Sequence, residues 1–337
     1  MNDQTQGEKV PTSRRRGRGC VSWLGASLAS LLGLLLVGYI YEPFAEAADA
    51  KAYPPPGQLV DVGGYRLHIY CTGSGGPTVV VEAGLGDWST SWGFVQSEVE
   101  KTTRVCTYDR AGMGWSDPGP LPRDAAQFAK ELHTLLQNAD VPGPYVMVGH
   151  SLGGLGVRVF VHEYASEVAG VVLIESMNPR QLPQASTGVG PQPNPQSRFY
   201  SVLTVLARVG VARLLARPVT QMLSPGTLPS ENAYYSRFVR TGSMQAARDE
   251  SQGLSASGAE AAAVKDFGDL PLIVLTGRLH TDPPDWQTWQ TELLQLSSNS
   301  QQSFAENGNH GIQLEEPDAA VAAILQMVQQ VRQTANK

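Results

Sequence analysis

The chain has 337 residues, of which 42% are hydrophobic and 17% are charged. A chain of this length can bury a sizeable core, either as one large α/β domain or as two smaller ones. Its net charge of −6 excludes a strongly basic nucleic-acid-binding domain, so we expect no nucleic acid among its partners. Its basic cluster comprises Arg14, Arg15, Arg16 and Arg18, close to the N-terminus.

A predicted membrane segment follows this cluster directly. Cys20 to Tyr41 is uncharged over about 22 residues and would span about 33 Å as a helix, enough to cross the hydrocarbon core of a bilayer. Trp23 near one end and Tyr39 near the other suit the two membrane interfaces. Because arginines favour the cytoplasmic side, residues 1–19 are predicted to be a cytoplasmic tail and residues 20–41 a transmembrane signal anchor. The rest of the chain then lies outside the cytoplasm.

A cleaved signal peptide is the competing interpretation of this segment. Ala45-Glu46-Ala47 resembles a small-x-small cleavage site, and cleavage there would give a secreted or periplasmic protein. We favour the uncleaved anchor, because the apolar run exceeds the usual length of a signal-peptide core. Residues 42–57, which end in Pro54-Pro55-Pro56-Gly57, are predicted to be a linker, and the globular domain to begin near Gln58.

From Gln58 onward, short β-type runs alternate with amphipathic helical patterns. A predicted hairpin around Gly63-Gly64 opens the domain, and the helical patterns include Arg123–Ala139, Tyr200–Leu215 and a segment that begins at Pro317. This alternation predicts an α/β fold with a doubly wound, mostly parallel sheet. The predicted strands are Leu59–Val62, Tyr65–Cys71, Thr78–Ala83, Arg104–Tyr108, Tyr145–Val148, Val171–Glu175, Leu272–Thr276 and Gln302–Ala305.

The segment Gly149-His150-Ser151-Leu152-Gly153 lies between a predicted strand and a predicted helix. In this context Gly-x-Ser-x-Gly forms a tight turn in which the serine takes a strained backbone and the two glycines let the chain pass without a clash. The turn raises the hydroxyl of Ser151 above the sheet and directs the N–H of Leu152 at any oxyanion beside it. Ser151 is therefore the candidate nucleophile.

These patterns, together with Tyr108-Asp109-Arg110-Ala111-Gly112-Met113-Gly114-Trp115-Ser116, resemble the α/β-hydrolase superfamily from about Gln58 to the C-terminal helix. The resemblance implies an eight-stranded sheet in which Ser151 follows the fifth strand. About 90 residues separate the sixth strand from the seventh, too many for a simple crossover, and they are predicted to form a helical cap. The predicted core comprises residues 58–177 and 268–337, and the cap residues 178–267.

A serine nucleophile needs a general base and an acid that orients this base, and in this superfamily they follow in the order Ser, acid, His. His310, in a loop before the last helix, is the predicted base, whereas His280 lies too early in the chain. Two carboxylates compete for the acid position: Glu175 ends the sixth strand and Asp282 follows the seventh. We favour Glu175, because a Glu at the end of a buried strand has little structural role unless it is paired, whereas Asp282 before two prolines suits a turn.

The resemblance also implies a second oxyanion donor and a neighbouring pair of cysteines. In Glu82-Ala83-Gly84-Leu85-Gly86, after the third strand, Leu85 occupies the donor position, so that Leu85 and Leu152 form the predicted oxyanion hole. The second and fourth strands are neighbours in this fold, which brings Cys71 and Cys106 together. A disulfide between them is feasible outside the cytoplasm, and two buried thiols are the alternative.

Ser151, His310 and Glu175 predict a serine hydrolase that cleaves an ester-like carboxylic substrate through an acyl-enzyme. The mostly apolar cap favours an apolar small-molecule ester, and the N-terminal helix makes the membrane a second partner. Two alternatives stay open: a ligand-binding protein with this fold, and an NAD-dependent oxidoreductase that uses Gly84-Leu85-Gly86-Asp87-Trp88-Ser89 as an incomplete dinucleotide fingerprint. We expect no metal and no cofactor, because the three cysteines are scattered and the sequence lacks a metal or phosphate-loop motif.

Overall fold

The computed structural model describes residues 17–182, 194–223, 231–281 and 283–335. Within these ranges eight strands form one sheet in the order β1-β2-β4-β3-β5-β6-β7-β8. β2 runs antiparallel to β1 and β4, whereas the remaining neighbours pair in parallel. The predicted α/β-hydrolase architecture is confirmed. The strands are β1 Gln58–Asp61, β2 Arg66–Thr72, β3 Thr78–Glu82, β4 Val105–Tyr108, β5 Tyr145–His150, β6 Val168–Ile174, β7 Leu272–Gly277 and β8 Ser300–Ala305.

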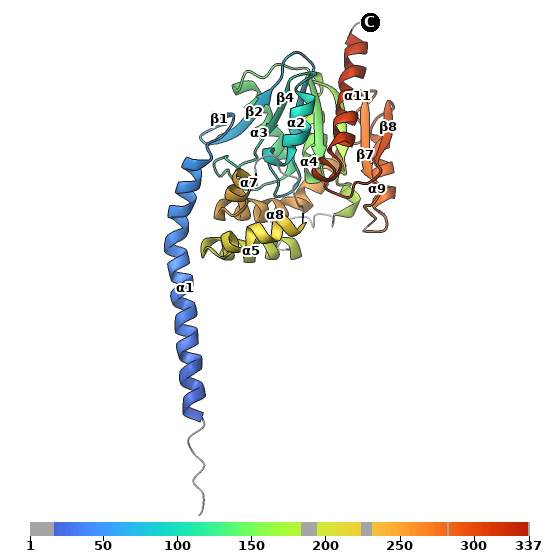
Figure 1. Cartoon of the computed structure of the whole chain (residues 1–337). Coiled ribbons are helices and arrows are strands. Elements are labelled where there is room, and N and C mark those ends of the chain that lie inside the picture. The colour runs from blue at the N-terminus through green and yellow to red at the C-terminus, as the bar shows by residue number, and fades with distance from the viewer. Residues whose placement is uncertain (1–16, 183–193, 224–230, 282, 336–337) are drawn as a thin grey trace, which may run out of the picture.

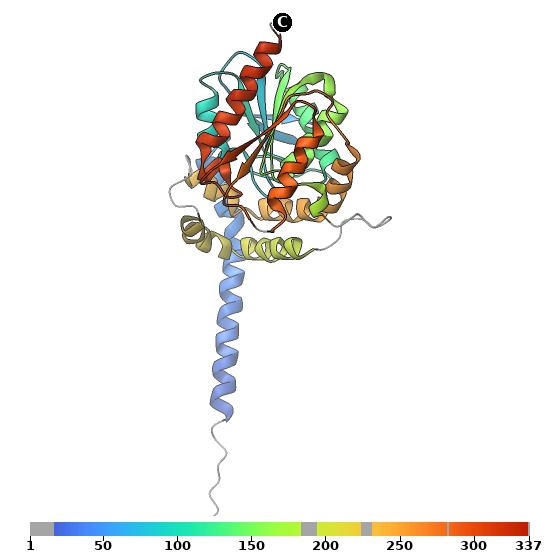
Figure 2. The ribbon, with the colours of Figure 1, turned by 90° about the vertical axis from the view of Figure 1, so that its right-hand side faces the viewer.

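Helices cover both faces of this sheet (Figures 1 and 2). Because side chains alternate along a strand, Val79 and Val81 of β3 join the core under α2 and α11, whereas Val80 joins the core under α3 and α4. The central strands are thus buried on both sides, which explains their uninterrupted apolar runs. The helices on these faces are α2 Gly93–Val99, α3 Ala125–Asn138, α4 Leu152–Glu163 and α11 Pro317–Ala335, and two shorter ones are α9 Trp286–Glu292 and α10 Ile312–Glu315.

A disulfide bond joins the two strands that pair at the antiparallel end of the sheet. Cys71 of β2 lies directly opposite Cys106 of β4 in the strand register, and their sulfurs are bonded. The bond ties the opening hairpin to the parallel part of the sheet. Its presence agrees with a domain that folds outside the reducing cytoplasm.

In the described part of the chain between β6 and β7, four α-helices form a cap: α5 Pro195–Arg208, α6 Val211–Leu223, α7 Glu231–Phe238 and α8 Thr241–Ala263. They gather at one end of the sheet, and α8 lies between α5 and the core (Figure 1). The single helical pattern expected over Tyr200–Leu215 is in fact two helices. Gly210 has a φ of 76°, a left-handed conformation that glycine adopts without strain, and this residue separates α5 from α6.

The N-terminal helix α1, Gly17–Ala52, extends away from the body on the side of the cap (Figures 1 and 2). It contains the predicted membrane segment and continues without a break to Ala52. The first part of the linker predicted over residues 42–57 is therefore helical. The physical reason is tertiary contact: Glu42 and Asp49 both form ion pairs with Arg213 of α6, so this stretch is held as a helix against the cap.

Candidate active site

Ser151 occupies the sharp turn between β5 and α4. Its backbone has φ 52° and ψ −120°, a strained conformation for a residue with a side chain. A Cβ atom on Gly153 would lie 2.3 Å from the carbonyl oxygen of Glu82, and a Cβ on Gly149 would lie 2.8 Å from the Cα of Gly154. The observed packing thus agrees with the prediction that both glycines are needed because the chain passes close to them.

The imidazole of His310 lies beside the Ser151 hydroxyl. Its Nε2 atom is 3.0 Å from Ser151 Oγ, within hydrogen-bond reach of a base that takes the serine proton. His310 stands in the loop between β8 and α10, and the Nε2–H of His150 donates a 2.8 Å hydrogen bond to its carbonyl oxygen. Burial, reinforced by the nearby His310, lowers the pKa of His150 to about 3, so His150 stays neutral and holds the loop by this single donor.

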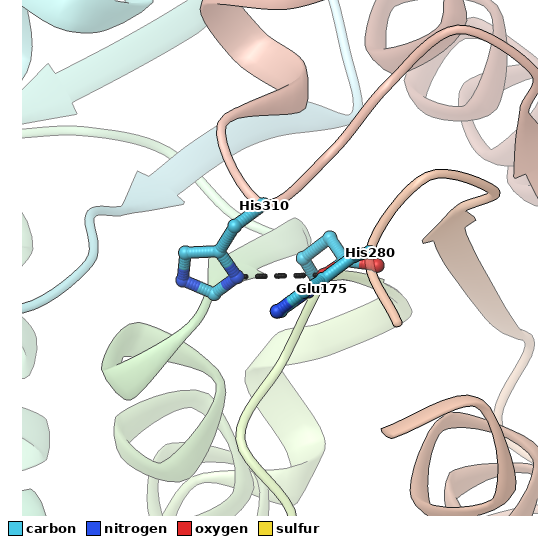
Figure 3. A group of neighbouring side chains, drawn as sticks. All are labelled: Glu175, His280 and His310. Carbon is cyan, nitrogen blue, oxygen red and sulfur yellow. Dashed lines mark hydrogen bonds and ion pairs between the residues drawn. The ribbon is translucent and has the colours of Figure 1, made fainter. Parts of the chain in front are cut away.

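Glu175 follows β6 directly, with a φ of 46°, and its side chain is fully buried. Its Oε1 atom accepts a 2.7 Å hydrogen bond from the N–H of Gly277, and its Oε2 atom is 3.4 Å from Nδ1 of His310 (Figure 3). Burial raises the pKa of Glu175, but the hydrogen bonds from His280, His310 and Gly277 together outweigh it and the net pKa is lowered. The carboxylate is therefore ionised at neutral pH and can orient a protonated His310.

The structure thus brings Ser151, His310 and Glu175 together in the predicted order. The alternative acid, Asp282, lies outside the described residues. The prediction missed His280, whose Nδ1 is hydrogen-bonded to Glu175 Oε2 and whose ring packs on Trp286 at 4.1 Å between centroids. Its position was a usable signal, because His280 stands three residues after Gly277, where other members of the superfamily carry the acid.

Among the described residues, Glu175, His280 and His310 form the one group that could hold a metal ion. Their candidate ligand atoms all lie within 4.8 Å of one another (Figure 3). His and carboxylate ligands suit zinc. However, each imidazole Nδ1 already faces the carboxylate, and Nε2 of His310 faces Ser151, so the hydrogen bonds account for the cluster without a metal.

The two predicted oxyanion donors belong to segments that adjoin Ser151. Leu152 is the first residue of α4, and the N–H of a first helical residue has no carbonyl partner within its helix. Leu85 lies in the turn after β3. A 3.2 Å hydrogen bond from the N–H of Asp87 to the carbonyl oxygen of Gly84 closes this turn. A Cβ on Gly84 would lie 3.4 Å from Ser151 Cβ, so this turn packs directly against the elbow.

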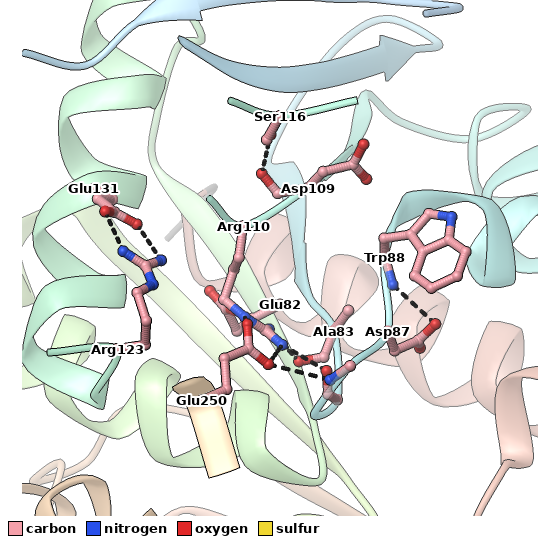
Figure 4. Close-up of polar contacts among 12 residues, drawn as sticks. Glu82, Ala83, Asp87, Trp88, Asp109, Arg110, Ser116, Arg123, Glu131 and Glu250 are labelled. Atoms are coloured by element: carbon pink, nitrogen blue, oxygen red, sulfur yellow. Dashed lines mark hydrogen bonds and ion pairs between the residues drawn. The ribbon is translucent and has the colours of Figure 1, made fainter. Parts of the chain in front are cut away.

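A buried arginine holds this turn in place (Figure 4). Arg110 donates to the carbonyl oxygens of Ala83 and Gly84, both at 2.6 Å, and pairs with Glu82 and Glu250 at 2.7 Å each. Glu250 comes from α8 of the cap. Burial lowers the pKa of Arg110, yet the two carboxylates raise it well above its usual value, so the arginine is permanently charged.

The prediction quoted Arg110 within a family-like loop but gave it no role, and it did not single out Glu250. No local pattern marks Glu250, because its partner is 140 residues away in the chain. The same contacts argue against the dinucleotide alternative. The N–H of Gly86 donates a 3.1 Å bond to Glu250 Oε2, so a carboxylate occupies the place where a pyrophosphate would have to bind.

The comparisons with known proteins agree with the fold. A model described as "Alpha/beta hydrolase family" matches residues 73–324. YqjL of Bacillus subtilis is 28% identical over 256 residues, which cover 75% of this chain and 83% of YqjL. Other curated relatives match over 123 to 158 residues, and the aligned part spans only 19% to 49% of their own lengths.

Two solved structures have the same fold. An esterase from Thermogutta terrifontis has a TM-score of 0.61 at 17% identity, and an epoxide hydrolase named CorEH has 0.62 at 20%. Each comparison covers 81% of this chain and 98% of the other, and at such identities the likeness shows the fold alone. The family model covers most of the globular domain, and the chain therefore belongs to the alpha/beta hydrolase family.

Proposed function

We propose that the protein is a serine hydrolase that cleaves ester-like carboxylic substrates through an acyl-enzyme. The observation that carries this proposal is the 3.0 Å approach of His310 Nε2 to Ser151 Oγ at a strained elbow. A serine hydroxyl is a weak nucleophile unless an adjacent base takes its proton. The family supports a hydrolase in general, and the Ser–His–Glu arrangement supports the serine mechanism within it.

In the first step His310 takes the proton of Ser151 as Oγ attacks the substrate carbonyl carbon. Glu175 keeps Nδ1–H of His310 oriented and stabilises the imidazolium that forms. The N–H groups of Leu85 and Leu152 bind the oxyanion of the tetrahedral intermediate. His310 then protonates the leaving alcohol, and in the second step it activates a water molecule that releases the acid from Ser151.

The residues around the turn after β3 favour an apolar substrate. Trp88 belongs to a buried cluster with Met113 and the cap residues Ala246 and Ala247, and its ring stacks on Tyr234 of α7 at 4.7 Å between centroids. This cluster adjoins the Leu85 turn on the side of the cap. An apolar acyl or alcohol group is therefore the proposed specificity.

A panel of p-nitrophenyl esters of increasing chain length tests the activity on the full chain in detergent. We expect hydrolysis that Ser151→Ala abolishes, because truncation removes the nucleophile. Ser97→Ala, an exposed serine on α2 whose hydroxyl donates to the Phe94 carbonyl of its own helix, is the matched control and should retain most of the activity. Absence of hydrolysis with every ester would favour the alternative of a binding protein with this fold.

We further propose that α1 anchors the protein in a membrane with the catalytic domain on the extracytoplasmic side. In the described part of the helix, a stretch from Trp23 to Ala52 is long and apolar enough to cross a bilayer, and none of its most apolar window is buried against the protein. The contacts of Glu42 and Asp49 with the cap favour retention of the helix over cleavage near Ala45-Glu46-Ala47. The mass of the protein extracted from membranes tests this, since cleavage would remove the whole apolar segment.

A further inference from the structure

The exposed large apolar side chains of the globular domain gather on two cap helices. Beyond α1, the described residues include seven such side chains, and five of them lie on α5 and α6. Exposures reach 59% for Phe199 and 77% for Leu214. We call this surface the α5–α6 face, and it comprises Phe199, Val202, Val205, Leu214 and Leu215.

The amphipathicity of α5 is inverted with respect to solvent. The helix buries Ser197, Thr204 and Ala207 on the side of α8, whereas Phe199 and Val202 point away from the body. A surface helix of a soluble protein normally does the reverse and buries its apolar stripe. A group of exposed apolar side chains of this kind marks a surface that another phase or molecule covers.

This face lies level with the end of the apolar segment of α1. A Cβ on Gly38 would lie 2.1 Å from the carbonyl oxygen of Val209, so the turn between α5 and α6 touches α1. Tyr39 and Tyr41 follow at once, and Glu42 is the first charged residue after the apolar segment. Both views show α5 lying crosswise to α1 at the end of the body from which α1 leaves (Figures 1 and 2).

Ion pairs fix this arrangement between the anchor and the cap. Arg213 of α6 binds Glu42 and Asp49 at 2.6 Å each, and Glu46 of α1 accepts a 2.9 Å hydrogen bond from the backbone N–H of Thr241 at the start of α8. Glu42 is 2% exposed, so this contact is buried. A cap fixed in this way to a membrane-spanning helix cannot leave the membrane surface while the contacts hold.

We infer that the α5–α6 face rests in the interfacial layer of the lipid bilayer that α1 spans. This inference depends on the membrane anchor proposed above and is independent of the reaction. An amphipathic helix in the interface buries its apolar face among acyl chains and keeps cationic side chains near the phosphates. Arg198 and Arg208, both exposed on α5, flank the apolar stripe and suit this role. The bilayer is the occupant that the position beside α1 favours.

Depth-dependent fluorescence quenching on the full chain tests this docking. A single environment-sensitive fluorophore is attached at Val202→Cys in a Cys20→Ser background, and the protein is reconstituted in lipid nanodiscs. The matched control is the same label at Gln333→Cys, an exposed position near the end of α11 that lies at the opposite end of the body (Figure 1). Iodide then quenches from water and brominated lipids quench from the bilayer.

At Val202→Cys we expect a blue-shifted emission, strong quenching by brominated lipids and a several-fold smaller iodide quenching constant than at Gln333→Cys. Equal iodide quenching at both positions would overturn the inference. Shielding from iodide without quenching by lipids would mean that protein covers the face, and it would also overturn the inference. Failure of the full chain to insert into lipid would also overturn the inference. Ester hydrolysis measured on the same samples tests the proposed reaction separately.

Discussion

His280 and His310 share one oxygen of Glu175: the Nδ1 atoms of both imidazoles lie against Oε2 (Figure 3). His310 is 41% exposed and His280 only 13%, so the imidazole that does not touch Ser151 is the more buried of the two. We interpret His280 as a positioning residue. It holds the Glu175 carboxylate in the orientation in which Oε1 accepts a hydrogen bond from Gly277 N–H and Oε2 faces His310.

His280→Asn should lower kcat with little change in KM, because the substrate does not contact His280 in the proposed mechanism. A change in KM as large as the fall in kcat would show that His280 has only a structural role.

Glu175→Gln should lower kcat by about 10³ to 10⁴, because a neutral amide neither stabilises the imidazolium nor selects its tautomer. Asp282→Asn, measured beside it, should retain nearly full activity. The wild-type carboxylate also contributes to stability: its pKa is lowered by folding, so this contribution is present above its unfolded pKa and lost as the pH falls through its folded pKa. A large loss of kcat in Asp282→Asn alone would reassign the acid.

Asp87 should make stability depend on pH in the opposite direction. Burial raises its pKa from 3.8 to about 6, although the Ser91 hydroxyl and the Trp88 N–H oppose this, and its Oδ2 atom has no hydrogen-bond partner. The folded state therefore binds the proton of the Asp87 carboxyl more tightly than the unfolded state does. This proton stabilises the folded state fully below about pH 4, and the stabilisation is lost as the pH rises through about 6. The Asp87→Asn variant does not suffer this loss of folding stability, which amounts to at most about 3 kcal/mol.

Thermal unfolding of both proteins at several pH values between 4 and 8 measures this effect. The melting temperature of Asp87→Asn should increase relative to that of the wild type as the pH rises, because the amide cannot ionise. Other titrating groups are common to both proteins and cancel in the difference. A constant difference across the whole range would mean that Asp87 titrates near its usual pKa.

The Arg110–Glu250 contact should support catalysis through the Leu85 turn. Glu250→Gln weakens the hold on Arg110, which donates to the Ala83 and Gly84 carbonyls, and a displaced oxyanion donor should lower kcat by about tenfold to a hundredfold. Breaking a buried ion pair also costs roughly 3–5 kcal/mol of stability.

Glu131→Gln is the matched control for that experiment. Glu131 pairs with Arg123 in a site that is equally buried and that does not touch the Leu85 turn (Figure 4). It should lose stability to a similar extent and keep its kcat. Equal kcat losses in both variants would mean that instability, rather than the turn, accounts for the effect.

The parts of the site that depend on local spacing were predictable, and those that depend on tertiary contacts were not. Ser151 follows from a five-residue pattern between a strand and a helix, and His310 from its place before the last helix. Glu250 contacts Arg110 across 140 residues, and no local pattern reports such a distance. The strands themselves were likewise predictable, because the apolar runs of buried parallel strands are distinctive.

The helical state of residues 42–52 depends on contacts that lie far away in the sequence. Alanine and acidic residues can form a helix or a solvated linker, and the contacts of Glu42 and Asp49 with Arg213, more than 160 residues later, decide between them. The break at Gly210 was visible as a glycine within an apolar pattern. Its left-handed backbone is what converts the expected single helix into α5 and α6.

Covalent labelling with a fluorophosphonate tests the central claim most directly, namely that His310 activates Ser151 as a nucleophile. The full chain is labelled, digested and analysed by mass spectrometry. The account predicts a single adduct on Ser151, loss of ester hydrolysis in proportion to labelling, and no labelling in Ser151→Ala or His310→Gln. Ester hydrolysis that persists in Ser151→Ala, or an adduct on another residue in the active protein, would contradict it.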